Sequence, residues 1–259
     1  MERPPGRFFL PGPTEVHPDV LNAQAVPPIG HRGPAMRELM MAVQPGLRSL
    51  FGTGRPVIVS TSSATGLMEA AVRGGVARKL LCLVNGAFSQ RFVDLAEQCG
   101  VPYEVLEVRW GEVHSPGAVA DRLAAGHFDA VSMVHSETST GALSDIGGIR
   151  RTLDEAGHPA LLLVDTISSL ASVDYRHEEW GVDVTVCCSQ KGLMLPPGLG
   201  MNAISKKALE ASAGSGLPRS YWDWGPVLKM NAQGFFPYTP PTNLLYGLNE
   251  AVTMLLEEG

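Results

Sequence analysis

Short runs of apolar residues recur along the chain, and a stretch of mixed polarity separates each run from the next. Several of these runs are apolar on both faces, which is typical of parallel β-strands that are covered by helices on each side. The strands that this pattern predicts lie at residues 56–60, 80–84, 103–108, 130–134, 161–164 and 184–188.

The stretches between these runs have helical length and one apolar face. Strands that alternate with helices predict an α/β fold, here a three-layer α/β/α arrangement around a mostly parallel sheet. A further helix is expected to begin near Leu244. The helices expected between the strands lie at residues 65–77, 88–99, 116–125 and 145–156.

Composition and charge exclude several classes of function. The chain has 259 residues, of which 44% are hydrophobic and 18% charged, as in an ordinary globular protein. The formal net charge is −6 and no basic run is present, which argues against a nucleic-acid partner. No apolar stretch approaches the roughly 18 residues of a membrane span, and the first residues lack the apolar region of a signal peptide. We therefore expect a cytoplasmic protein that contacts neither nucleic acid nor membrane.

The cysteines and histidines lack the spacing of a metal site. Neither a C-x-x-C pair nor an H-E-x-x-H motif occurs. We therefore expect no bound metal, and reduced, mostly buried thiols of the kind found in cytoplasmic proteins. The cysteines are Cys82, Cys99, Cys187 and Cys188.

Polar side chains follow several of the predicted strands. In open α/β sheets, ligands bind beyond the carboxyl ends of the strands. The segments expected there supply small hydroxyl residues, one aromatic ring, one acid and one lysine, which are the groups needed to hold a phosphorylated aromatic aldehyde. These segments are 61–66, 85–88, 135–138, 165–166 and 189–191.

The segment 63–66 is a candidate phosphate site because it comes just before a predicted helix. A helix N-terminus offers unpaired N–H groups and a positive dipole end. The alternative is that Ser63 or Thr65 is a plain helix cap. Neither a G-x-G-x-x-G nor a G-x-x-x-x-G-K-[ST] motif is present, which argues against a dinucleotide or a nucleoside triphosphate.

Asp165 and Lys191 follow two apolar strands and are candidates for chemistry. Asp165 is expected to be poorly solvated and to need a cation, either a protonated pyridine nitrogen or a structural salt-bridge partner. Lys191 precedes a Gly/Pro-rich turn at 196–200, which favours an enclosed, nucleophilic lysine over a solvated one. Phe88 either belongs to the core or lies flat against a planar ligand.

The order of several short motifs resembles that of the class V aminotransferases, which have pyridoxal-phosphate (PLP) fold type I. Within that family the resemblance is to the alanine–glyoxylate, serine–glyoxylate and serine–pyruvate enzymes. The matching motifs include P-G-P-T at 11–14, G-H-R at 30–32, S-A-T-G at 63–66, N-G-A-F at 85–88, H-S-E-T-S-T-G at 135–141, S-Q-K at 189–191, P-P-G-L-G at 196–200 and P-Y-T-P-P at 237–241.

The resemblance implies a role for each matching residue. Lys191 is the catalytic lysine that binds PLP, and Gln190 assists beside it. Asp165 pairs with the pyridine nitrogen, Phe88 stacks on the ring, and Thr138 contacts the ring hydroxyl. Three residues at the start of a helix hold the phosphate: Ser63, Ala64 and Thr65.

The resemblance also implies a homodimer. Thr239 is expected to reach the phosphate of the neighbouring subunit, and the segments around Gly12 and His31 line the substrate entrance. We expect an N-terminal arm at 1–25, a large PLP-binding domain at 26–240, and at 241–259 the start of a linker helix. The small C-terminal domain of the family, with its substrate-binding arginine, is expected to be missing.

The function that the resemblance implies is transamination of alanine or serine with glyoxylate or pyruvate as amino acceptor. Gln190 stands where cysteine desulfurases carry a histidine, which favours transamination over a lyase- or desulfurase-like reaction. A non-catalytic PLP-fold protein that acts as a binding or assembly partner is the alternative. It is motivated by the missing domain and by Ala64, where the family commonly has glycine.

Overall fold

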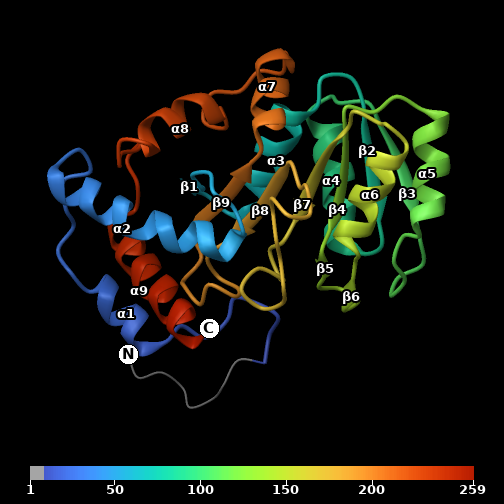
Figure 1. Ribbon diagram of the computed structural model, residues 1–259. Coiled ribbons are helices and arrows are strands. Elements are labelled where there is room, and N and C mark those ends of the chain that lie inside the picture. Colours follow the sequence, from blue (N-terminus) through green and yellow to red (C-terminus); the bar gives the residue numbers. More distant parts are fainter. Residues whose placement is uncertain (1–8) are drawn as a thin grey trace.

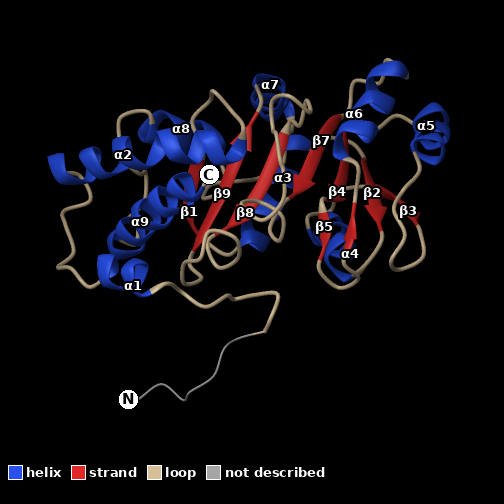
Figure 2. Cartoon of the chain, turned by 60° about the horizontal axis from the view of Figure 1, so that its bottom comes forward, coloured by secondary structure: helices blue, strands red, loops and turns tan. Residues whose placement is uncertain are grey.

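The computed structural model describes residues 9–259 and has one large sheet with helices on both faces (Figures 1 and 2). The order of strands across this sheet is β1-β9-β8-β7-β4-β2-β3. The central strands pair in parallel, whereas β9 is antiparallel to both β8 and β1. The predicted α/β fold with a mostly parallel sheet is therefore confirmed.

The bounds of the strands follow the apolar runs. Most strands are buried along their whole length, as expected for parallel strands covered on both faces. A short hairpin of β5 and β6 lies outside the large sheet. The strands are β1 Ile58–Thr61, β2 Leu80–Val84, β3 Tyr103–Glu107, β4 Ala130–Val134, β5 Ser136–Glu137, β6 Ala142–Leu143, β7 Leu161–Asp165, β8 Val184–Cys188 and β9 Leu199–Ile204.

Two apolar clusters, one on each face of the sheet, form the core. Alternate residues of one strand enter different clusters, as Leu81 and Leu83 show against Leu80 and Cys82. On the first face the cluster contains residues of α1 Pro18–Gln24, α2 Pro34–Phe51, α5 Pro116–Ala125, α6 Ile146–Glu155 and α9 Thr242–Glu258. On the second face it contains residues of α3 Ala64–Gly75, α4 Ala87–Gln98, α7 Lys206–Gly214 and α8 Trp224–Asn231.

The ends of the helices have local causes in the sequence. Ser115 caps α5 by accepting a hydrogen bond from Ala118 N–H, and Pro116 occupies the first turn, where its missing N–H costs nothing. Asp145 caps α6 in the same way through Gly148 N–H, at 2.8 Å. Gly52 ends α2 in the left-handed conformation that glycine adopts most readily.

One predicted segment was wrong and several elements were not predicted. The expected turn at 196–200 stops earlier, because Leu199 and Gly200 already belong to β9 and pair with β8 and β1. The helices α1, α2, α7 and α8 had not been predicted. The division into an arm, a large domain and a linker helix stays a prediction, although α9 buries Leu245 and Leu248 in the same cluster as α2. Within residues 9–259, no helix is long and apolar enough to cross a membrane.

Candidate active site

A cavity of about 220 Å³ lies at the carboxyl ends of the central strands. Its lining comes from the segments after β1, β2, β4, β7 and β8, together with part of the N-terminal segment. This is where an open α/β sheet places its ligands. The lining residues are Gly12, Ser63, Ala64, Thr65, Phe88, Arg91, Val134, Ser136, Thr138, Asp165, Ile167, Ser168, Gln190 and Lys191.

The start of α3 forms one end of this cavity. Ser63 is the N-cap residue, but its side chain makes no capping hydrogen bond, so its hydroxyl is not used by the helix. Ala64 and Thr65 are the first helical residues, and their N–H groups have no carbonyl partner within the first turn of a helix. This end of the cavity is therefore suited to an anion.

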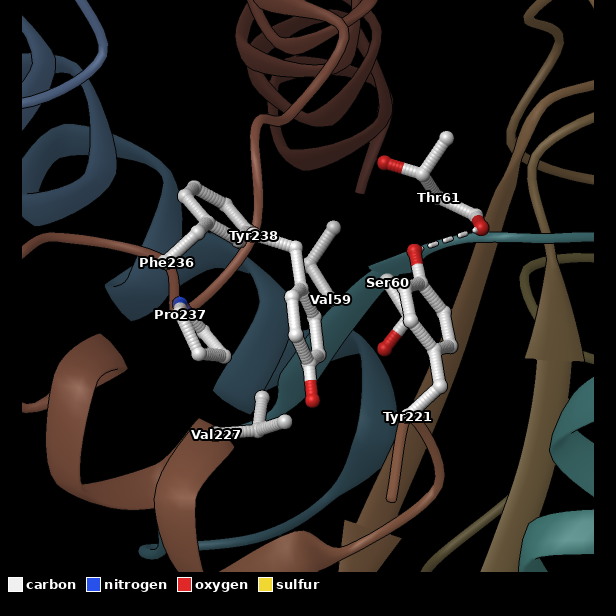
Figure 3. Close-up of a pocket in the computed structure, with 8 residues that line it drawn as sticks. All are labelled: Val59, Ser60, Thr61, Tyr221, Val227, Phe236, Pro237 and Tyr238. Carbon is white, nitrogen blue, oxygen red and sulfur yellow. Dashed lines mark hydrogen bonds between the residues drawn. The ribbon is translucent and has the colours of Figure 1, made fainter.

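Side chains around a small pocket beside β1 hold the segment that precedes α3 (Figure 3). The Tyr221 hydroxyl donates a hydrogen bond to the carbonyl oxygen of Thr61, at 3.1 Å. The rings of Tyr221 and Tyr238 stack with their centroids 4.7 Å apart, and Phe236 is buried. These contacts hold the carboxyl end of β1, two residues before Ser63.

Glu137 fixes the first turn of α4, which carries Phe88. The carboxylate of Glu137 is fully buried and accepts hydrogen bonds from the N–H groups of Phe88, at 3.2 Å, and Ser89, at 2.8 Å. Burial alone would raise the pKa of Glu137, but hydrogen bonds from Ser139 and Ser89 outweigh burial and lower it. An ionised carboxylate at a helix N-terminus is stabilised by the helix dipole.

Asp165 is the last residue of β7 and is 2% exposed. Its Oδ1 accepts a hydrogen bond from Ile167 N–H at 2.7 Å. Burial raises the pKa of Asp165 to about 7, although the hydrogen bond from Ile167 opposes the increase. A cation in the cavity would favour the charged form of this carboxyl and lower its pKa.

Lys191 lies in the loop after β8 and is half-buried. Its Nζ donates a hydrogen bond to the carbonyl oxygen of Pro11 at 2.8 Å. The N-terminal segment is held there by Thr14, whose N–H donates to Gln190 O and whose hydroxyl donates to Lys191 O. At Gly12 a Cβ would overlap the side chain of Lys191, so any larger residue would displace the lysine from its present position.

Two further polar groups of the cavity are positioned by local contacts. The hydroxyls of Thr138 and Ser168 lie 2.6 Å apart. The side-chain oxygen of Gln190 is buried without a hydrogen-bond partner. Because an unpaired buried polar atom is costly, it is suited to a ligand that donates a hydrogen bond.

Most of the predicted site residues line this one cavity, but two do not. His31 and Thr239 line a second hollow, formed with residues 28–29 and 240–244. Gly12 and His31, which were predicted together at a substrate entrance, therefore lie in different hollows. Arg91, Val134, Ile167 and Ser168 line the cavity without having been predicted, and Ser136 lies in a predicted segment but had been given no role.

No metal centre accompanies the cavity. Residues 9–259 contain no cluster of histidine, cysteine and acidic side chains that could hold an ion. Burial raises the pKa of Cys82 and of Cys188 to about 12, so these thiols are poor ligands and poor nucleophiles. Cys187 is also buried, and Cys99 is partly exposed.

Known proteins resemble this chain over nearly its whole length. A sequence model of the family described as "Aminotransferase class-V" matches residues 20–259. The serine–glyoxylate aminotransferase of Methylorubrum extorquens is 41% identical, over 99% of this chain and 67% of its own length. The L-aspartate–glyoxylate aminotransferase of Paracoccus denitrificans is 39% identical, over 97% of this chain and 65% of its own length.

A solved structure shares the fold over the full length of the chain. The alanine–glyoxylate aminotransferase from Nostoc sp. superposes with a TM-score of 0.94 at 34% identity. The match covers 100% of this chain and 70% of that structure. The chain thus spans about two thirds of the length of the curated relatives it matches.

Proposed function

This chain belongs to the class-V aminotransferase family, and from that premise we propose that it is a PLP-dependent enzyme that transfers an amino group from a small amino acid to glyoxylate or pyruvate. One observation carries the proposal. A lysine, a buried carboxyl and an unpaired helix N-terminus line the same cavity at the carboxyl edge of the sheet. A lysine, an acid and an anion site are what PLP requires of a protein.

The residues present fit PLP at each of its polar ends. The start of α3, with Ser63 and Thr65, would hold the phosphate. Asp165 would pair with the pyridine nitrogen, because burial disfavours the charge of its carboxyl and the nearby charges of Arg91 and Lys191 only partly offset that. The unpaired oxygen of Gln190 offers an acceptor beside Lys191, and Phe88 offers a flat apolar surface. When bound, PLP supplies an aldehyde and a ring that withdraws electrons.

Lys191 would act twice in such a reaction. Its Nζ is the amine that binds the cofactor covalently. Once an incoming amino acid has freed this amine, it would take the proton from the α-carbon and return it to a neighbouring carbon. The Pro11 carbonyl, 2.8 Å from Nζ, would hold the freed amine near that position.

The remaining cavity residues would orient the reacting groups. Thr138 would hydrogen-bond the ring hydroxyl, and Ser168, 2.6 Å away, would fix the direction of that hydroxyl. Phe88 would limit the tilt of the ring from its position on α4, which Glu137 holds in place. The carboxylate of Asp165 would keep the ring nitrogen protonated and so maintain the ring's capacity to accept electrons.

We assign alanine or serine as the amino donor and a homodimer as the assembly. Related enzymes are named for serine, alanine or aspartate as donor and glyoxylate as acceptor, which supports a small donor. Thr239 and His31 lie outside the cavity of their own chain, which supports a contribution to the site of a second subunit. The reduced, mostly buried thiols support a cytoplasmic location.

The test is absorption spectroscopy of the purified chain with PLP, before and after borohydride reduction. We expect a new band that reduction fixes to Lys191 and that Lys191→Ala lacks. Lys206→Ala, which changes an exposed lysine outside the cavity, is the matched control and should behave as wild type. Amino donors would then be screened with glyoxylate.

Two results would contradict the proposal. The absence of any band fixed to Lys191 would contradict the binding of PLP and favour a non-catalytic binding role. A band without turnover of any amino donor would be consistent with PLP binding but would contradict transamination.

A further inference from the structure

Arg91 was not predicted from the sequence, yet it is one of the few charged groups that line the cavity. The charged lining residues are Arg91, Asp165 and Lys191. Asp165 and Lys191 already have roles under the proposed function, at the ring nitrogen and at the aldehyde. Arg91 is therefore a positively charged residue of the cavity to which the proposed function gives no role.

The position of Arg91 is fixed by neighbours on α3 and α4. Its Nη1 donates a hydrogen bond to Thr65 Oγ1 at 3.2 Å. Its guanidinium lies 5.2 Å from the centroid of the Phe88 ring, a residue one helical turn earlier on the same face of α4. The guanidinium is thus held beside the start of α3, at the end of the cavity suited to an anion.

Arg91 makes no ion pair with a carboxylate in the described part of the chain, although its charge acts on the buried Asp165 and lowers the pKa of that carboxyl. Other arginines make such ion pairs, as Arg73 does with Glu69 and Arg78 with Asp129. Arg91 is half-buried, and the hydrogen bond to a neutral hydroxyl leaves most of its N–H donors free. A partly desolvated cation of this kind is stabilised when an anion enters the cavity.

We propose that Arg91 is the fixed cation that binds the phosphate of the cofactor, together with the N-terminus of α3. This inference rests on the proposed function, since it assumes that PLP is the ligand. The hydrogen bond to Thr65 favours the phosphate over the carboxylate of an amino acid as the ligand of Arg91. The reason is that Thr65 lies at the start of α3 and not beside Lys191. The rigid fork of donors on arginine suits the oxygens of a phosphate.

The experiment is equilibrium dialysis of the full chain with PLP and with pyridoxal, which lacks the phosphate. Arg91→Gln should raise the dissociation constant of PLP by roughly tenfold or more, the loss expected for a charged hydrogen bond. The dissociation constant of pyridoxal should change by less than about threefold, since no charged contact to it is lost. Arg91→Lys keeps the charge but not the fork of donors, and should recover part of the affinity for PLP.

Arg109→Gln is the matched control, because it removes an exposed arginine outside the cavity and should leave both constants unchanged. If Arg91 only supports Phe88 and α4, Arg91→Gln will weaken PLP and pyridoxal equally, and the inference is overturned. It is also overturned if PLP binds normally while the KM for the amino acid rises, which would make Arg91 a carboxylate site. If the wild-type chain binds neither compound, the proposed function itself is contradicted, and the inference is contradicted with it.

Discussion

The buried carboxyl of Asp165 should make the cofactor-free protein less stable as the pH rises. The folded chain holds this carboxyl at a pKa of about 7, against an ordinary value of 3.8. Below pH 3.8 the group is neutral in both states and costs nothing. Above that value the unfolded chain loses the proton first, so the folded state is progressively disfavoured until the pH passes about 7.

The size of this effect follows from the difference between the two pKa values. At about 1.36 kcal/mol for each pH unit, the cost reaches about 4 kcal/mol at pH 8 and less than about 2 kcal/mol at pH 5. Asp165→Asn removes the titration and keeps the shape. We therefore expect the variant to gain about 2.5 kcal/mol over wild type between pH 5 and pH 8.

The assay is urea unfolding of the cofactor-free wild type and variant across this pH range. Asp129→Asn is the control of opposite sign. Although burial would raise the pKa of Asp129, hydrogen bonds from Arg78 and Lys79 lower it, so this carboxylate stabilises the fold above its ordinary pKa. Its removal should destabilise the chain by an amount that is constant from pH 5 to pH 8.

A difference between Asp165→Asn and wild type that does not change with pH would refute this reasoning. A difference in unfolding free energy that fell as the pH rose would refute it as well. Added PLP should reverse the ranking at pH 8, because a protonated ring nitrogen would compensate the charge of Asp165 but not an asparagine. A cofactor that stabilises both proteins equally would contradict the pairing of Asp165 with that nitrogen.

Three further substitutions test the surroundings of the cavity. Gly12→Ala places a Cβ against the Lys191 side chain at a positive φ, so borohydride-trapped incorporation of PLP should slow by roughly tenfold and urea unfolding should show a loss of stability; an unchanged rate would contradict the close approach. Glu137→Gln should cost roughly 1–3 kcal/mol of unfolding free energy at neutral pH, and urea unfolding should show this cost shrink as the pH falls from 4.5 through the lower pKa of the folded carboxyl. Ser168→Ala removes the hydrogen-bond partner of Thr138 and should weaken the binding of PLP about fivefold in equilibrium dialysis. An unchanged affinity would contradict a contact between Thr138 and the ring hydroxyl.

The buried strands could be predicted because their apolar runs are continuous. β2 and β7 carry aliphatic residues on both faces, and β4 and β8 are buried along their whole length. A run of four or five residues is too short for a helix, so these runs indicate strands. β9 escaped prediction because Gly200 and Asn202 interrupt its pattern and because a Pro/Gly turn directly precedes it. It is buried all the same, since the amide of Asn202 donates to the carbonyl of Thr185 on the neighbouring strand.

The sequence could predict those site residues that directly follow a strand or belong to a motif of the resembled family. Asp165, Lys191 and the start of α3 each follow a strand, and such positions meet at one edge of a sheet. Arg91 lies one turn inside α4 and not directly at the end of a strand. A single arginine on an amphipathic helix usually faces solvent, and only the packing of α4 against α3 brings it to the cavity. The roles of individual residues toward PLP stay predictions.

The order of strands has a consequence for how the chain folds. The early strand β1 lies at an edge of the sheet and pairs with β9, from a part of the sequence far downstream, and Ser62 N–H donates to Gly198 O. Pairings of such high contact order form late, because a long loop must close first. The pairings among β2, β3 and β4 are more local and can form earlier on the ribosome. The start of α3 would then be the last wall of the cavity to take its place, so that a nascent chain could capture a phosphorylated ligand only after β9 has been synthesised.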